Sequence, residues 1–525
     1  MTVEDSRTTT VDEPGLSPVM ARLFRALALV ERVGNRLPHP FWLFWILSGT
    51  LAVASAVLAA RSTSVTLPGS GDDVVVRNLL SADGAAFALG SALENFAGFP
   101  PLPVVVTVLM GVAVAERSGL MAAVLRVTIV RLPARWVTFA VAFAGTVSHV
   151  TFDAAFVILI PMAALAFKSV GRSPVVGVVT AYVSISAGYN ASPLVTPSDA
   201  IIASLTTSAA QVVDPSYVVS PLASYYWNAA SSLLVAVVVT VMIELVLSRR
   251  PGQEADVEEL EAGAPADGPT TLALTRTESR GLWLALGVGT LLVGAVVAAT
   301  LPDSSPLRGE SGTFTQSILL LNVAVVVAVT FAVMGFIYGR VTGSIASAGD
   351  LPGLMAEGVR LVAPIIVLFF SISQFLAYFS WTGIGSVTAV NGAELLERTD
   401  THPLMVLVAL VVVVSVINLL VTSGSAMWSL IAPIVVPMLM YIDVSPEVAQ
   451  TVYRIGDSCT NAVTPMSAYF VLALGYMQQY RRSAGIGTLA SFTLPIAMVL
   501  LVAWIAFFAL WYAVGLPLGP GVPVR

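Results

Sequence analysis

The chain has 525 residues, of which 57% are hydrophobic and only 11% are charged, and its mean hydropathy is +0.88. Soluble domains carry about 25% charged residues, so the composition excludes a soluble domain and predicts an all-α polytopic membrane protein. Much of the net charge of −6 comes from one acidic loop, and we expect no nucleic-acid partner. Cys459 is the only cysteine and the three histidines are scattered, so we expect neither an intrachain disulfide nor a zinc site.

Residues 1–36 are predicted to form a cytoplasmic N-terminal region, in which a polar tail precedes a basic amphipathic stretch. Positive charge ahead of the first span places the N-terminus in the cytoplasm. The apolar runs predict about nine full crossings, with the termini on opposite sides. The clearest spans are expected at 41–60, 102–116, 219–247, 281–301, 315–339, 355–378, 403–421 and 485–515, with a short helix at 84–98 and a basic surface helix around 117–135.

An acidic cytoplasmic linker at 249–280 separates a first transmembrane half, 37–248, from a second half, 281–515. Its Glu and Asp residues lie among Pro and Gly, which is typical of a solvated linker. The C-terminal tail, 516–525, is expected outside, because two arginines precede the last span.

Residues 423–470 lie among long apolar segments but contain features that a spanning helix normally avoids. Small polar residues begin the stretch, prolines interrupt it, and Arg454 and Asp457 place two ionisable side chains within it. Such side chains are expensive in a membrane and usually mark a transport pathway or a paired site. Broken backbone at membrane depth is tolerated where it lines a polar cavity or is buried in protein. The stretch therefore predicts a substrate site built of interrupted helices.

An earlier stretch, 149–200, shows the same order of features. The correspondences are Pro161-Met162 with Pro437-Met438, Ser173-Pro174 with Ser445-Pro446, and Asn190 and Pro193 with Asn461 and Pro465. Two broken segments at corresponding places in two halves indicate the binding site of a secondary transporter. We expect an inverted repeat with re-entrant hairpins near 149–172 and 423–445. Their half-helix N-termini would face the centre and suit an anionic ligand.

Arg454 and Asp457 are three residues apart and share one helix face. Arg454 would hold a substrate carboxylate with its planar guanidinium, and Asp457 would position it or carry a coupling proton. The alternative is a buried ion pair that only locks the helix in place. Asp199 is either a proton or cation site or a helix cap, because Pro-Ser-Asp also starts helices well.

Trp428 and Phe152 occupy corresponding positions at the hairpin tips, where they would stack on an aromatic substrate or serve only as packing. Polar side chains in both stretches offer the oxygen donors of a sodium site, or help helices to pack. These side chains are Asn190, Ser192, Ser423, Ser425, Ser458, Thr460 and Asn461, and sodium is expected near Asn190, Ser192, Thr460 and Asn461. His149 and Asp153 are spaced i, i+4, but without a third candidate they predict a polar pair rather than a metal site.

Four segments resemble the AbgT family of bacterial transporters, which is named for uptake of p-aminobenzoyl-glutamate. They are NRLPHPFWLFWILSG (35–49), SGSAMW (423–428), APIVVPMLM (432–440) and YRIGDSCTNAVTPMSAYF (453–470). The resemblance implies an inner-membrane homodimer with nine transmembrane helices and two opposed hairpins per protomer, divided into a scaffold and a transport unit. It also implies that some members export sulfonamide antimetabolites. The family's functional positions fall on Asp199, Ser425, Trp428, Pro446, Arg454, Asp457 and Pro465, while Met427 replaces a usual lysine.

We therefore expect a transporter of small anionic aryl compounds such as p-aminobenzoyl-glutamate, not an enzyme, with no cofactor beyond a coupling proton or sodium ion. The glutamate carboxylates would meet Arg454 and the hairpin N-termini, and the aryl ring would pack near Trp428. The alternatives are a sodium-coupled dicarboxylate carrier, an intramembrane enzyme using His149 and Asp153, and a passive channel. The sequence leaves open both the direction of transport and the choice of proton or sodium.

Overall fold

The computed structural model describes residues 38–68, 71–130, 134–151, 154–247, 273–302, 304–308, 317–398, 401–464 and 467–525. Phe152, Asp153 and Pro465 therefore lie outside the described residues. Helices make up most of the described chain, and its small sheet pairs β1 (Ser64–Thr66) antiparallel with β2 (Asp73–Val75). The predicted all-α class is confirmed.

Six helices of the described chain are long and apolar enough to cross a membrane. They are α2 (Pro40–Ala60), α11 (Tyr225–Leu245), α13 (Arg276–Thr300), α15 (Val323–Thr342), α16 (Leu351–Trp381) and α22 (Ile486–Val514). The pair α5 (Pro101–Arg117) and α6 (Leu120–Val130) is bent by 67° and gives a seventh candidate if counted as one span. The count of nine crossings stays a prediction.

The remaining helices are shorter, and several of them build the interrupted segments. They are α3 (Ala82–Gly90), α4 (Ala92–Ala97), α7 (Val137–Val147), α8 (Ala154–Ser169), α9 (Pro174–Ser186), α10 (Pro197–Ala210), α14 (Ile318–Leu321), α17 (Ile384–Arg398), α18 (Pro403–Asn418), α19 (Gly424–Met440), α20 (Pro446–Cys459) and α21 (Ala468–Gln478). Short 3₁₀ turns connect some of them, including η2 (Ser148–Thr151) and η6 (Thr460–Ala462).

One expectation at the edge of a span is corrected. Helix α13 begins before residue 281, inside the expected linker, because Thr275 and Glu278 form a capping box that starts it at Arg276. Helix α6 packs against α13 and α15, where Leu120 and other residues of it are buried, and its expected place at the cytoplasmic surface stays a prediction. An ion pair between Arg126 and Glu278 also ties α6 to α13.

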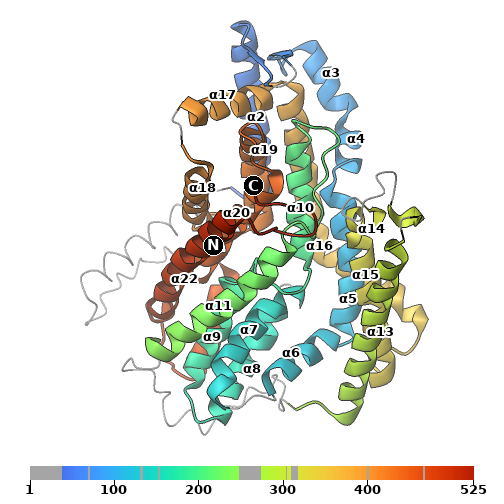
Figure 1. Cartoon of the computed structure of the whole chain (residues 1–525), viewed down its shortest axis with the longest axis vertical. Helices are drawn as coiled ribbons and strands as arrows, with labels where there is room; N and C mark the ends of the chain where they lie inside the picture. The colour runs from blue at the N-terminus through green and yellow to red at the C-terminus, as the bar shows by residue number, and fades with distance from the viewer. Residues whose placement is uncertain are drawn as a thin grey trace, which may run out of the picture.

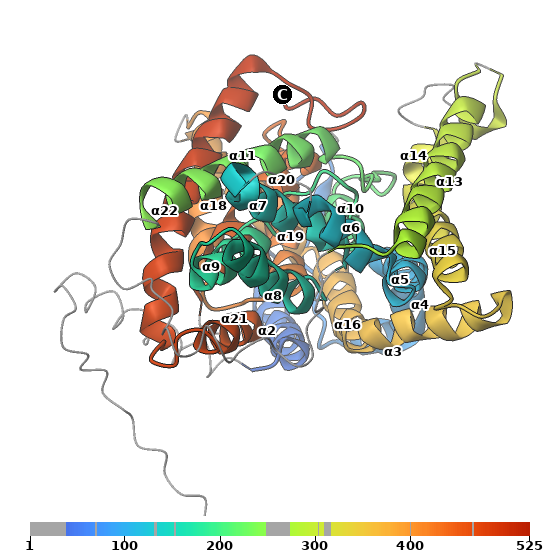
Figure 2. The same cartoon turned by 90° about the horizontal axis from the view of Figure 1, so that it is seen from below.

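The helices pack in two groups that stand side by side (Figures 1 and 2). The first group contains α2–α6 and α13–α16, and in both views α13 and α15 stand at its outer edge, far from α22. The second group contains α7–α11 and α17–α22, where α8 packs on α9, α18 on α20, and α10 on α19. Helices α5 and α10 are in contact where the groups meet.

Close backbone contact holds the first group together. A Cβ atom on Gly111 of α5 would lie only 2.1 Å from the backbone oxygen of Ala328 in α15, so a larger residue would force the two helices apart. Small residues at such crossings are typical of membrane helices, where dispersion contacts and not the hydrophobic effect drive association. The first group therefore has the tight packing expected of a scaffold.

The second group contains both interrupted segments, in the same order of elements. Helix α8 is followed by a turn and by α9, which begins at Ser173-Pro174, and α19 is followed by a turn and by α20, which begins at Ser445-Pro446. A break then precedes α10 in the first segment and α21 in the second. Helix α8 comes after η2 (Ser148–Thr151) and α19 after the turn at 419–423, so each expected hairpin range covers one helix and the turn that follows it. The inverted orientation stays a prediction.

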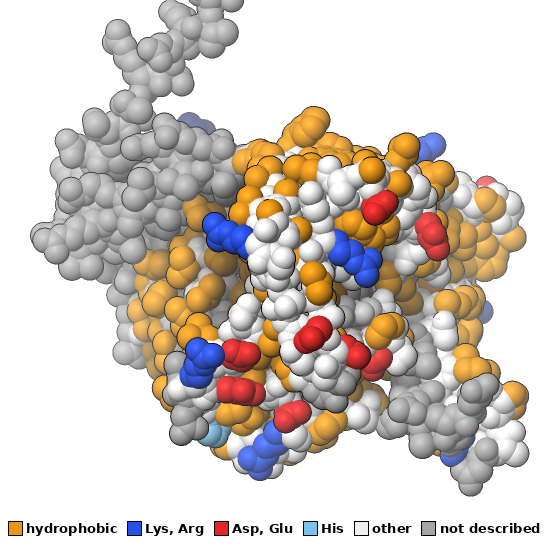
Figure 3. Space-filling model, turned by 90° about the horizontal axis from the view of Figure 1, so that it is seen from above, with side chains coloured by type: hydrophobic (Ala, Val, Ile, Leu, Met, Phe, Trp, Pro, Cys, Tyr) orange, Lys and Arg blue, Asp and Glu red, His pale blue; other side chains and the backbone are white. Residues whose placement is uncertain are grey.

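Charged side chains are sparse on the outside of the molecule. Figure 3 shows them scattered over the end that carries α17 and the β1–β2 hairpin, with hydrophobic side chains around the rim. The C-terminal tail also packs on the second group, because Leu518 is buried and its carbonyl accepts the N–H of Trp227 at 3.1 Å. This distribution of charge and apolar surface fits a chain embedded in lipid.

Candidate functional site

The two interrupted segments meet inside the second group. The break between α9 and α10 lies against the C-terminal end of α20, where the Asn190 amide nitrogen Nδ2 donates to Asp457 Oδ2 at 2.8 Å. The backbone N–H of Asn190 also donates to Ser458 Oγ at 3.2 Å. Residues far apart in the sequence thus form one buried polar layer, which we call the ion-pair layer (Asn190, Asp199, Arg454 and Asp457).

Arg454 forms its ion pair with Asp199 and not with Asp457. The distance between Arg454 Nη1 and Asp199 Oδ1 is 2.6 Å, and the two residues are only 1% and 4% exposed. The alternative of a buried ion pair between Arg454 and Asp457 is therefore wrong, because helix α10 from the first segment packs on α20 and supplies the nearer carboxylate. Removing one partner from such a buried pair costs about 3–5 kcal/mol, because the other charge is left uncompensated.

Asp199 also starts α10. Its Oδ2 accepts the N–H of Thr196 at 2.7 Å, and the two residues form a capping box in which Thr196 is the cap and Asp199 the third helical residue. The amide of Asn228, from α11, donates to Asp199 Oδ1 at 3.0 Å. Of the two interpretations of Asp199, the helix cap is thus confirmed. The same carboxylate also forms the ion pair with Arg454.

Asp457 faces the N-terminus of α19. A Cβ atom on Gly424 would lie 2.8 Å from Asp457 Oδ2, so only glycine leaves room for the carboxylate here. The Tyr453 hydroxyl donates to the carbonyl of Gly424 at 2.5 Å and fixes this first turn. Asp457 Oδ1 has no hydrogen-bond partner among the described residues. The partial positive charge of the helix N-terminus stabilises a carboxylate in this position.

Asn418, at the end of α18, belongs to the same region and was missed from the sequence. Its Nδ2 donates to the Asp457 carbonyl at 2.6 Å, to Thr460 Oγ1 at 2.8 Å and to Asn461 Oδ1 at 3.0 Å. An asparagine inside the apolar run VVVVSVINLL was the available signal, because polar residues at membrane depth are usually functional.

Several buried oxygens near this point lack partners within the described chain. They are Asn190 Oδ1, Asp457 Oδ1 and Asn418 Oδ1. Carboxylate and amide oxygens are suitable ligands for a hard cation. Ser192 is bonded within its own turn, where its Oγ accepts the N–H of Leu194 at 3.1 Å. The described residues contain no group of three His, Cys, Asp or Glu that would hold a metal ion.

Trp428 is buried behind the tip of the second hairpin. It is 0% exposed, its Nε1 donates to Thr206 Oγ1 at 2.9 Å, and its ring lies 4.4 Å from that of Tyr453. Thr206 in turn donates to Gln450 Oε1 at 3.0 Å, so α10, α19 and α20 are joined by one polar chain. Trp428 therefore packs helices in this structure and does not line the neighbouring cavity between the two groups of helices.

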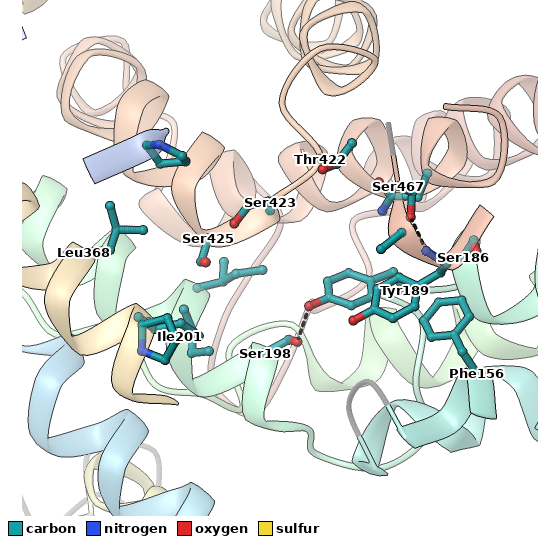
Figure 4. A pocket seen from close by; sticks show the side chains of 18 of the residues that line it. Phe156, Ser186, Tyr189, Ser198, Ile201, Leu368, Thr422, Ser423, Ser425 and Ser467 are labelled. Carbon is teal, nitrogen blue, oxygen red and sulfur yellow. Dashed lines mark hydrogen bonds between the residues drawn. The ribbon is translucent and has the colours of Figure 1, made fainter. Parts of the chain in front are cut away.

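A cavity of about 490 Å³ opens between the two groups of helices (Figure 4). This volume lies within the roughly 300–1,000 Å³ of small-molecule sites. Ser423, Gly424 and Ser425, from the first turn of α19, lie on one side of it. Pro364 and Leu368 of α16 add wall from the first group. The cavity therefore lies where movement of one group against the other would change its access.

Aromatic side chains form the other side of the cavity. Phe156 of α8, Tyr189 of the first break and Tyr469 of α21 line it, and the Ser198 hydroxyl donates to the Tyr189 hydroxyl at 3.2 Å. None of these four residues stood out in the sequence, because Tyr, Phe and Ser are too common in membrane helices to be informative singly. The described residues that line the cavity include no Arg, Lys, Asp or Glu.

The remaining candidates take structural positions. Pro446 is buried in the first turn of α20, where its fixed backbone suits a helix start. His149 is buried with its ring 5.3 Å from Tyr189, and its Nε2 has no partner in the described chain.

The sequence profile of the AbgT putative transporter family matches residues 25–525. The chain belongs to the AbgT family. It is 35% identical over 500 residues to the p-aminobenzoyl-glutamate transport protein of Escherichia coli K12, covering 94% of this chain and 96% of that protein.

Two solved structures of this family are similar over most of the AbgT chain. The Alcanivorax borkumensis YdaH transporter has a TM-score of 0.84 and 36% identity, covering 92% of this chain and 100% of YdaH. Neisseria gonorrhoeae MtrF, described among a class of antimetabolite efflux pumps, has a TM-score of 0.88 and 37% identity, covering 95% of this chain and 100% of MtrF. The chain is thus a multi-pass inner-membrane transporter, and the intramembrane-enzyme alternative is wrong.

Proposed function

We propose that this AbgT transporter carries p-aminobenzoyl-glutamate and related aryl compounds with carboxylate groups, driven by a cation gradient. The observation that carries the proposal is the cavity between the two groups, which combines aromatic side chains with the first turn of a helix and contains no fixed negative charge in its described wall. The named activity of the Escherichia coli relative and the efflux class of MtrF support the same substrate class.

The substrate carboxylates would bind at the start of α19. The hydroxyls of Ser423 and Ser425 line the cavity there, and the first N–H groups of a helix have no acceptor within the helix. Arg454 would act indirectly, because its guanidinium is buried and already bound to Asp199. Its contribution is to hold α10 and α20 together below the cavity.

Coupling would arise from Asp457, on the other side of the same helix turn. An uncompensated carboxylate next to Gly424 would repel a substrate carboxylate at Ser425, whereas a bound cation would remove the repulsion. A sodium ion would be held by the partner-free oxygens of Asn190, Asn418 and Asp457. Cation and substrate would then bind cooperatively, and each would raise the affinity for the other by the same factor.

Flux measurements in proteoliposomes test the proposal. Purified protein is given labelled p-aminobenzoyl-glutamate, and sodium and pH gradients are imposed separately. We expect accumulation against the substrate gradient when sodium is supplied. An Asp457→Asn variant should still exchange substrate but should no longer accumulate it.

Three other outcomes would reject parts of the proposal. Accumulation driven only by a pH gradient would show that the coupling ion is a proton and not sodium. Competition by succinate as effective as by the aryl substrate would favour a dicarboxylate carrier, and flux that never exceeds equilibrium would favour a passive channel.

We also propose a homodimer, as the family resemblance implies, with the N-terminus cytoplasmic and the C-terminus outside. Cys459 is the only cysteine and is buried, so single cysteines introduced near either terminus can be labelled selectively from one side of the membrane. Labelling of both termini from the same side would reject this orientation. Cross-linking in the membrane tests the dimer, and a monomeric product alone would argue against it.

A further inference from the structure

The aromatic side of the cavity is built by residues from both halves of the chain. The rings of Phe156 in α8 and Tyr469 in α21 are stacked, with centroids 4.0 Å apart and planes at 4° to each other. Both residues line the cavity, and Tyr189 joins them there. Phe156 is buried, whereas Tyr469 is partly exposed in the cavity wall.

A second row of aromatic rings holds this stack in place. Tyr182 lies 6.3 Å from Phe156, and Phe470 meets Tyr182 edge to face at 6.0 Å. The Tyr182 hydroxyl donates to the Asn461 carbonyl at 3.4 Å, which ties the row to the second break. Side chains fixed by their neighbours lose little freedom when a ligand binds, so the stack is a preorganised surface.

The two sides of the cavity therefore differ in chemistry. Figure 4 shows Ser423 and Ser425 on one side and Phe156 and Tyr189 on the other, facing the same space. A ligand that spans this space can place an acidic or polar group near Ser423 and Ser425 and a flat ring near Phe156 and Tyr189, although serine hydroxyls also line the aromatic side. Trp428, the aromatic residue that the sequence favoured for stacking, is buried outside this wall.

We propose that Phe156, Tyr189 and Tyr469 form the aryl-recognition site of the transporter and set its preference for aryl acids over alkyl acids. This inference rests on the proposed function, because it assigns one end of the same cavity to the substrate ring. Offset or edge-to-face contact of the ring with this wall contributes about 0.5–1.5 kcal/mol per aromatic pair beyond the area that it buries. That energy is available only to substrates with an aromatic ring.

Competition binding to the purified full chain tests the assignment. The probes are p-aminobenzoyl-glutamate and acetyl-glutamate, which keeps the amide and both carboxylates but lacks the ring. We expect Tyr469→Leu to weaken p-aminobenzoyl-glutamate about tenfold, or about 1.4 kcal/mol, and to leave acetyl-glutamate unchanged. Tyr469→Phe should keep the preference, because it retains the ring, and Phe156→Leu should reduce it in the same direction.

Phe139→Leu is the matched control. It also removes one ring from a stacked pair, since Phe139 and Phe143 have parallel rings 6.1 Å apart in α7, but neither residue lines the cavity. This variant should bind both probes as the unmodified protein does.

Equal weakening of both probes by Tyr469→Leu, or no preference in the unmodified protein, would overturn the inference. If the preference depends on Tyr469 but vesicles show no flux of p-aminobenzoyl-glutamate, the recognition site stands and the proposed transport substrate fails.

Discussion

The ion-pair layer and the cavity wall lie next to each other but differ in the side chains that form them. In the layer, charged side chains find partners within the protein, as Arg454 does with Asp199 at 2.6 Å. In the wall, serine hydroxyls and aromatic rings line an open cavity, and the described wall carries no acidic, Arg or Lys side chain. The charges thus organise the helices, whereas neutral groups are available to the substrate. Substitutions in the two regions should therefore fail in different ways.

Arg454→Met should have the largest effect. It leaves the buried Asp199 carboxylate without its partner, so we expect the free energy of unfolding to fall by about 3–5 kcal/mol and transport to be lost. The double variant Arg454→Met with Asp199→Asn removes both charges and keeps an oxygen for the helix cap. It should recover most of the stability without recovering transport. Unfolding in detergent and flux in vesicles measure the two effects, and a stable single variant would contradict the prediction.

Gly424→Ala should have an intermediate effect, because Gly424 lines the cavity and also lies against Asp457 of the ion-pair layer. The new methyl group would lie 2.8 Å from Asp457 Oδ2 and would push the carboxylate away from Asn190. We expect a loss of about 1–2 kcal/mol in stability and about tenfold weaker activation by the coupling cation. Gly287→Ala is the matched control, since no atom lies within 4 Å of its added Cβ. If transport by Gly424→Ala depended on the cation as it does in the unmodified protein, Asp457 would not take part in coupling.

Trp428→Phe should have a smaller effect, restricted to packing. The variant loses the hydrogen bond to Thr206 but keeps a ring against Tyr453. We expect about 1 kcal/mol less stability and the same ratio of aryl to alkyl binding. Competition binding with the two probes gives that ratio. A selective loss of the aryl probe would place the substrate ring at Trp428 after all.

Arg398→Ala should have the smallest effect. Arg398 pairs with Glu394 one turn away in α17, with a distance of 3.0 Å, and both side chains are at least half exposed. Solvent screens such pairs, so the stability should change by less than about 0.5 kcal/mol and transport should not change. A large change would mean that α17 takes part in a contact outside the described chain.

Most residues of the ion-pair layer could be predicted from the sequence, whereas the aromatic residues of the cavity wall could not. Arg454 and Asp457 were recognised because ionisable groups are rare in spans. Asp199 stood out as the acidic residue after a proline break. Tyr469 and Phe156 were missed, because an aromatic residue in an apolar helix is ordinary and its partner is more than 300 positions away. The alternative of an ion pair between Arg454 and Asp457 was wrong, since spacing in the sequence indicates only contacts along one helix.

The sequence by itself determined the membrane class, most of the long helices, the two interrupted segments and the family. These features follow from composition and from local breaks by proline and glycine, which act over a few residues. Only the tertiary structure decided that Asp199 and Arg454 are partners, that Trp428 is buried, and that Phe156 and Tyr469 share one wall. Those contacts depend on how α8, α10, α20 and α21 pack, and long-range packing leaves no periodic signal in the chain.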